Sequence, residues 1–158
     1  MIIDSHCHLT YEPMSNALNE TINRANKDGI KYILTISTVD KSFEQILKIV
    51  NGYESVYGTY GIHPHEAKSH QHIKSDDIID KVNQNKKIIG IGETGLDFYY
   101  NHSEKKDQIY SFEEHISAAQ EKNLPLIVHT RSAEKETLQI LEKHSKKKET
   151  KILIHCFT

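Results

Sequence analysis

Residues 88–93 read Ile88-Ile89-Gly90-Ile91-Gly92-Glu93, a short apolar run that ends in a single carboxylate. Runs of this kind predict strands of a parallel sheet, because such strands are covered on both faces. The same pattern recurs with histidine at or near its end, in Ile2-Ile3-Asp4-Ser5-His6-Cys7-His8, Gly58-Thr59-Tyr60-Gly61-Ile62-His63-Pro64-His65, Leu126-Ile127-Val128-His129 and Ile152-Leu153-Ile154-His155. Imidazole and carboxylate groups at the ends of successive strands are what a metal site on a parallel β/α scaffold requires.

Amphipathic segments separate these runs, so strand and helix alternate along the chain. We predict six strands, at residues 2–5, 32–37, 56–61, 88–92, 125–128 and 151–154, and five helices, at 15–27, 42–51, 75–85, 105–122 and 133–143. This order fits either an open doubly wound sheet or a (β/α)₈ barrel of the TIM type. Polar candidates follow five of the six strands, which favours the barrel, and the length predicts one domain over residues 1–158.

Five of the polar residues are candidate metal ligands. His6 and His8 are two apart on a predicted strand, so both imidazoles point to one face and can reach one ion. Glu93 follows a stretch without other charge, and a buried carboxylate there needs a partner, either a metal ion or a Lys or Arg side chain. His129 and His155 each close an apolar run. Either one alone is typical of a hydrogen-bonded core residue, but together with the pair and the glutamate they favour a metal site.

His63 and His65 flank Pro64 after the third predicted strand. One dinuclear site needs only a few ligands, so we interpret these two histidines as substrate-facing groups that hydrogen-bond a phosphate or transfer a proton. The alternative is a rigid polar turn. Cys7 and Cys156 also lie beside histidines, but the alternation of a strand turns each cysteine away from its neighbour, so we do not expect them to bind metal.

The net charge of −2 is not that of a general nucleic-acid binder. The one basic run, Lys146-Lys147-Lys148, falls at a predicted helix end, and we interpret it as a solvated surface. No apolar run approaches the ~20 residues of a membrane span, and no basic signal region precedes the first strand. We therefore expect a cytoplasmic protein that binds no membrane and attracts any polyanionic substrate chiefly through bound metal.

The chain resembles the TatD family of metal-dependent hydrolases, in the amidohydrolase-like superfamily. The resemblance lies in Asp4-Ser5-His6-Cys7-His8-Leu9, Gly61-Ile62-His63-Pro64-His65, Ile91-Gly92-Glu93-Thr94-Gly95-Leu96-Asp97-Phe98-Tyr99-Tyr100, Leu124-Pro125-Leu126-Ile127-Val128-His129-Thr130-Arg131 and His155-Cys156-Phe157-Thr158. The order and spacing of these stretches match across all 158 residues. The resemblance implies a (β/α)₈ barrel with a two-metal centre that acts as a 3′-5′ exonuclease on single-stranded DNA or RNA ends.

The resemblance also implies a ligand set for two divalent ions. His6 and His8 would hold the first ion, Glu93 would bridge both, and His129 and His155 would hold the second. This donor set suits Zn²⁺, Mn²⁺, Ni²⁺ or Mg²⁺, with solvent in the remaining positions, and its many imidazoles favour a transition metal.

On the substrate side, the resemblance implies that His63 and His65 face the scissile phosphate. Arg131, two residues past a ligand, would grip that phosphate with two hydrogen bonds. Tyr99, on the aromatic loop after Glu93, would stack on a terminal base, although packing of a barrel rim is the alternative for that loop. The implied catalytic set is therefore Glu93, His63, His65 and Arg131.

The chain is shorter than a barrel of this type, which needs roughly 250 residues. We therefore expect a TIM-type barrel that stops after strand 6 of 8, with inward-facing side chains short of packing partners. It would lack the aspartate that the resemblance implies at the end of the eighth strand. The open edges of strands 1 and 6 would favour self-association or pairing with a separate C-terminal fragment.

Three functions remain open from the sequence. The first is a TatD-type nuclease whose activity is impaired by the short chain. The second is a hydrolase of another ester or amide, such as D-aminoacyl-tRNA. The third is an inactive remnant that does no chemistry.

Overall fold

The computed structural model describes residues 1–156, so Phe157 and Thr158, the end of the last motif, lie outside the described residues. Strands and helices alternate as predicted. The strands are β1 (Ile2–Cys7), β2 (Ile30–Thr35), β3 (Val56–Tyr60), β4 (Ile88–Asp97), β5 (Leu126–Arg131) and β6 (Ile152–Ile154). The helices are α1 (Leu18–Lys27), α2 (Phe43–Gly52), α3 (Ser75–Asn83), α4 (Lys105–Lys122) and α5 (Glu134–Ser145), with 3-10 turns at Ser15–Ala17, Asp40–Ser42 and Pro64–His70.

The six strands form one sheet in the order β1-β2-β3-β4-β5-β6, and every neighbouring pair is parallel. A doubly wound sheet reverses its strand order at a switch point, and this sheet does not. The order is that of a half-barrel, which confirms the barrel-type prediction over the doubly wound alternative. Within residues 1–156, β1 and β6 each pair along one edge only.

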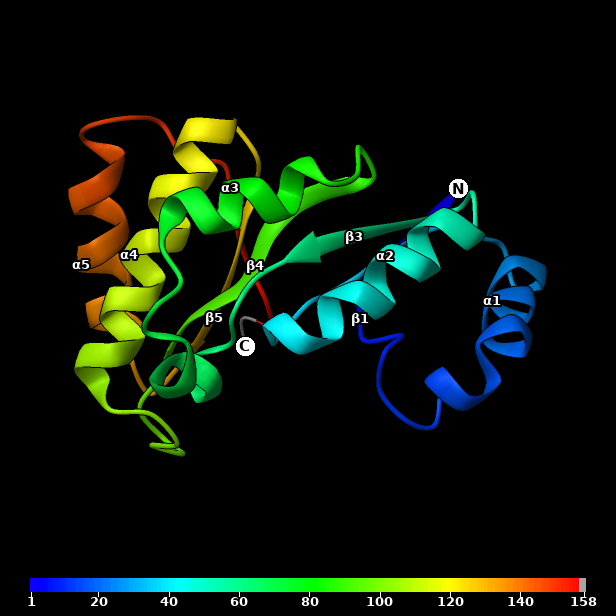
Figure 1. Cartoon of the computed structure of the whole chain (residues 1–158), viewed down its shortest axis with the longest axis horizontal. Helices are drawn as coiled ribbons and strands as arrows, with labels where there is room; N and C mark the ends of the chain where they lie inside the picture. Colours follow the sequence, from blue (N-terminus) through cyan, green and yellow to red (C-terminus); the bar gives the residue numbers. More distant parts are fainter. Residues whose placement is uncertain (157–158) are drawn as a thin grey trace.

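The hydrophobic core lies between the sheet and its helices. The helices pack on neighbouring strands, α1 on β2, α2 on β3, α3 and α4 on β4, and α5 on β5. Figure 1 shows α2 and α3 lying over the strands, with α4 and α5 side by side. Ile46 of α2 and Phe112 and Ile116 of α4 are fully buried against the sheet, so the apolar faces of these helices hold the strands in place.

The other face of the sheet has no such cover among the described residues. Ile3 of β1 is 51% exposed, Ile89 of β4 is 39% exposed and Leu153 of β6 is 40% exposed. An apolar cavity of about 260 Å³ opens on this side, lined by Ile3, Ser5, Tyr32, Ile33, Leu34, Tyr57 and Ile89. As expected, the inward-facing side chains lack packing partners. No helix within residues 1–156 combines the length and apolar character that a bilayer crossing requires.

β4 and β5 are longer than predicted. Leu96 and Asp97 continue the pairing of β4 with Thr130 and Arg131 of β5, beyond an irregularity in the register. Glu93 and His129 therefore lie within strands, although the sequence placed them just after strand ends. The apolar runs stop at these residues, but the backbone hydrogen bonds between β4 and β5 continue beyond them.

Candidate metal centre

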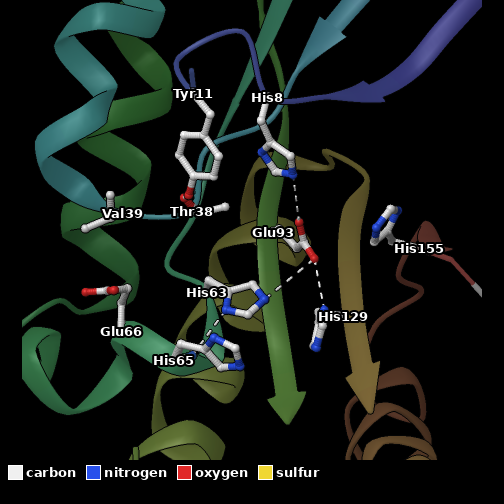
Figure 2. Close-up of a pocket in the computed structure, with 10 residues that line it drawn as sticks. All are labelled: His8, Tyr11, Thr38, Val39, His63, His65, Glu66, Glu93, His129 and His155. Carbon is white, nitrogen blue, oxygen red and sulfur yellow. Dashed lines mark hydrogen bonds and ion pairs between the residues drawn. The ribbon is translucent and has the colours of Figure 1, made fainter. Parts of the chain in front are cut away.

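Figure 2 shows the candidate site as a ring of histidines around Glu93. Glu93 projects from β4, His129 from β5 and His6 from β1. His8 follows β1, His63 begins the Pro64–His70 turn after β3, and His155 follows β6. The site borders a cavity of about 350 Å³, which is lined by His8, Tyr11, Thr38, Val39, His63, His65, Glu66, Glu93, His129 and His155.

The two carboxylate oxygens of Glu93 face different histidines. Oε2 lies 3.2 Å from His6 Nε2 and 3.8 Å from His8 Nε2. Oε1 lies 3.0 Å from His129 Nδ1 and 3.8 Å from His63 Nε2. Two groups of ligand atoms result, each within 4.8 Å of one another: His6, His8 and Glu93 in one, and His63, Glu93 and His129 in the other. Glu93 belongs to both, which is the position that a bridging carboxylate requires.

His6 tests whether these residues fit a metal ion. Both ring nitrogens of His6 are buried and have no hydrogen-bond partner among residues 1–156. Nε2 lies near Glu93, but without the geometry of a hydrogen bond. Buried polar atoms are rarely left unpaired, because the lost hydration is costly. A divalent ion would supply the missing partner of Nε2, and the imidazole and carboxylate donors suit such an ion. The residues therefore fit a metal centre.

The electrostatics of the group follow from its burial and its mixed charge. Burial by itself would raise the pKa of Glu93, but the hydrogen bond from His129 and the nearby His6 outweigh it and hold that pKa well below its usual range. Burial lowers the pKa of His63 to about 3 and also lowers the pKa of His8 and His155. Glu93 is therefore ionised at neutral pH, and these three imidazoles are neutral, as metal binding or proton acceptance requires.

Two glycines allow β3 and β4 to approach closely beneath the site. A Cβ atom on Gly61 would lie 2.4 Å from the Cα atom of Gly92, so no larger residue fits there without a shift of the backbone. Gly92 itself has a φ of +133°, a conformation that side-chain-bearing residues rarely adopt. Gly92 directly precedes Glu93, and Gly61 lies two residues before His63. Their small size brings His63 to Glu93.

The family model described as TatD related DNase matches residues 3–158. The chain belongs to the TatD family. It is 36% identical to an uncharacterized metal-dependent hydrolase of Buchnera aphidicola (subsp. Baizongia pistaciae), over 99% of this chain and 59% of the relative. It is 30% identical to the 3′-5′ ssDNA/RNA exonuclease TatD of Shigella flexneri, over 99% of this chain and 60% of that protein.

Solved TatD-family structures share the fold. The TatD homologue YJJV of Escherichia coli superposes with a TM-score of 0.82 at 24% identity, over 99% of this chain and 60% of that one. A TatD family hydrolase of Entamoeba histolytica gives 0.88 at 22% identity, over 99% and 58%. The chain thus spans about six-tenths of the length of these relatives. The TIM-type fold and the membership of a metal-dependent hydrolase family are confirmed.

The TatD-type site residues expected from sequence do not all gather at the cavity. His155 lines the cavity and its ring stacks on that of His6, with 3.5 Å between the centroids, but it belongs to neither group of ligand atoms. Arg131 and Tyr99 are exposed and are not among the lining residues. The Arg131 guanidinium instead lies over two tyrosine rings, 4.5 Å from Tyr99 and 4.6 Å from Tyr100.

Sequence reasoning gave no role to Asp97, although it lies within a quoted motif. Its carboxylate is buried and contacts both His65 and His129. Tyr11 and Thr38 were also missed. They hydrogen-bond each other and form the wall of the cavity beside His8. Thr38 directly follows the strand predicted at residues 32–37, but its hydroxyl is not one of the imidazole or carboxylate groups that mark a metal site. Asp97 and Tyr11 follow no comparable apolar run, so the pattern that identified the histidines could not find them.

Proposed function

We propose that the chain carries the centre of a two-metal phosphodiesterase that removes nucleotides from the 3′ ends of single-stranded DNA or RNA. The observation that carries this proposal is the position of Glu93, whose two oxygens each face two imidazoles. The described activity of the Shigella flexneri relative supports the choice of substrate. In the proposed ligand set, His6 and His8 would hold one ion, His129 and His155 would hold the other, and Glu93 would contribute to both.

The hydrogen-bond partners of the histidines support this division of roles. His8 Nδ1 donates to the Ile36 carbonyl oxygen at 3.3 Å, which leaves the lone pair of Nε2 directed at Glu93 and available to a metal. In His63 the roles of the two ring nitrogens are reversed, because Nδ1 accepts a hydrogen bond from the backbone N–H of His65 at 3.2 Å. A neutral His63 therefore carries its proton on Nε2. That nitrogen is suited to donating a hydrogen bond and not to binding a metal.

The proposed mechanism assigns each group one task. Two divalent ions, when bound, lower the pKa of a water and offset the negative charge of the phosphoryl group. Glu93 stays ionised and fixes the spacing of the two ligand groups. His63 donates from Nε2 to a phosphate oxygen, and His65 orients the substrate beside it. Arg131, held on the tyrosine rings, contacts a neighbouring phosphate, and Tyr99 presents a face on which the terminal base stacks.

An end-labelled oligonucleotide assay tests the proposal. The chain is incubated with Mn²⁺, Mg²⁺ or Zn²⁺ and single-stranded DNA or RNA labelled at its 5′ end. We expect a ladder that shortens from the 3′ end and disappears with EDTA and in His129→Ala. His63→Ala, which removes the proposed hydrogen-bond donor, should keep its metal content and lose about 10²–10³-fold in rate, the usual cost of losing one donor to a charged oxygen in the transition state. Glu113→Gln, which alters a carboxylate on the outer helices, is the matched control and should cleave normally.

We expect the 158-residue chain alone to cleave weakly, because part of its sheet lacks cover and its relatives are longer. The assay is therefore repeated with the segment of the Buchnera aphidicola relative that lies beyond the matched part. Stronger cleavage with that segment supports the proposal. No cleavage in either case, while the whole relative cleaves under the same conditions, contradicts it. If the chain hydrolyses a D-aminoacyl-tRNA ester and does not cleave nucleic acid, its substrate is a carboxylic ester and not a phosphodiester.

A further inference from the structure

Asp97 is a completely buried residue at the end of β4, and both oxygens of its carboxylate have hydrogen-bonding partners. Oδ1 accepts the backbone N–H groups of Tyr99 and Tyr100, each at 3.0 Å. Oδ2 lies 2.8 Å from His65 Nε2 and 3.3 Å from His129 Nε2. One oxygen is therefore fixed by the backbone, and the other is shared by a metal-side and a substrate-side histidine.

The backbone of Asp97 is held as firmly as its side chain. Gln108 of α4 accepts the Asp97 N–H at 2.7 Å and donates to the Asp97 carbonyl oxygen at 3.0 Å. Gln108 also donates to the Ser103 carbonyl oxygen at 2.9 Å, and the Ser103 hydroxyl in turn donates to the carbonyl oxygen of His65 at 2.8 Å. The carboxylate thus cannot swing away from the two imidazoles without breaking a buried network.

The contact with Asp97 decides which nitrogen of His129 is free to bind a metal. An ionised carboxylate accepts hydrogen bonds and cannot donate one, so Asp97 keeps a proton on His129 Nε2. Nδ1, which lies 3.0 Å from Glu93 Oε1, is then the nitrogen that would hold a metal ion. A carboxylate behind a metal-bound imidazole typically fixes the ring orientation and makes the ligand more basic.

We propose that Asp97 is a positioning residue that fixes His129 as an Nδ1 metal ligand and holds His65 on the substrate side through the same oxygen. This inference rests on the proposed metal centre and extends it. It couples the two sides of the site, because any displacement of the Asp97 carboxylate moves both imidazoles. Asp97 itself belongs to neither group of ligand atoms and does not line the cavity.

The substitution Asp97→Asn tests this role with little change of shape. The two N–H donors of Tyr99 and Tyr100 require an acceptor, so the asparagine must place its carbonyl oxygen there. Its NH₂ group then faces His65 and His129 and donates to them. His129 Nε2 must become an acceptor, its proton moves to Nδ1, and the metal loses that lone pair.

The Zn²⁺ affinities of the wild type, Asp97→Asn and Glu113→Gln are measured by competition with a chelator. We expect Asp97→Asn to bind about 10–100-fold more weakly, as is usual for the loss of such a partner. Glu113→Gln removes a carboxylate beside another histidine, His144, outside the site and should bind as the wild type does. The unfolding midpoints of the metal-free proteins show whether Asp97→Asn remains folded.

Nitrogen-15 NMR of histidine-labelled, Zn²⁺-loaded wild type shows which ring nitrogen of His129 carries the proton and which binds the metal. A residue that only stabilises the fold would not determine this assignment. We expect the proton of His129 on Nε2 and the metal on Nδ1. The opposite assignment overturns the inference even if Asp97→Asn fails to fold. Unchanged affinity in a folded Asp97→Asn also overturns it and leaves the proposed function standing. If the wild type binds no divalent ion, both the proposed metal centre and this inference are wrong.

Discussion

His115 of α4 lies outside the candidate site but supports it from behind. The residue is fully buried, its Nε2 accepts the backbone N–H of Ile62 at 3.1 Å, and its Nδ1 donates to the Ser111 carbonyl oxygen at 2.7 Å. Burial lowers the pKa of His115 to about 4. The residue therefore holds the backbone just before His63 in place only while its ring is neutral.

This buried histidine makes the stability of the metal-free chain depend on pH. The folded-state pKa lies below the unfolded value of about 6.5, so the unfolded state binds the proton first as the pH falls. The stabilising effect is complete above that value and is lost between about pH 6.5 and pH 4. We expect the free energy of unfolding in urea to fall by about 2 kcal/mol from this group between pH 7 and pH 5. His115→Gln, which does not titrate, should show a shallower pH dependence, and an equal dependence would contradict the prediction.

The remaining residues of the site differ in how far the sequence could identify them. Glu93 and the six histidines stand out because each ends or follows an apolar run, a signal that is local in sequence. Asp97 gives no such signal, since its importance depends on contacts with His65 and His129 that only the fold creates. The roles of His8 and His63 also depend on backbone partners from elsewhere or from the turn, which no side-chain pattern encodes.

At the scale of elements, the order of strands and helices was predictable, and the ends of the strands were not. Hydrophobic periodicity identified the six strands and the five α-helices of residues 1–156. It placed the end of β4 at residue 92, however, because polar Glu93 and Thr94 interrupt the apolar run. The strand continues to Asp97 through backbone pairing with β5, and the pairing passes over an irregularity that side-chain patterns do not reveal.

The approach of β3 to β4 gives a prediction for Gly61. We expect Gly61→Ala to destabilise the chain by about 1–3 kcal/mol, because the added Cβ overlaps the backbone of Gly92. It should also weaken metal binding, since a shift of the Gly92 backbone displaces the adjacent ligand Glu93. Gly52→Ala is the matched control, because nothing lies within 4 Å of a Cβ at that position of α2. Thermal unfolding and Zn²⁺ titration of both variants check this, and equal behaviour of the two would refute it.

At the scale of the whole molecule, one face of the sheet is covered by helices and the other exposes apolar side chains. Exposed apolar patches and unpaired strand edges favour association. We expect the 158-residue chain to self-associate, and the double variant Ile3→Lys with Leu153→Lys to do so much less. Leu138→Lys, at an exposed position on helix α5, should leave association unchanged. Sedimentation velocity measures all three, and a wild type that stays monomeric at high concentration would rule the prediction out.

The strand order β1 to β6 has a consequence for how the protein is made. The histidines around Glu93 come from the regions of β1, β3, β5 and β6, while β4 carries Glu93 itself, and they extend from His6 to His155 along the sequence. Residues so far apart in sequence meet only after slow, long-range steps of folding. During synthesis on the ribosome, His6 and His8 must therefore wait for Glu93. Capture of a metal ion by this first group would then report that the sheet has folded at least as far as β4.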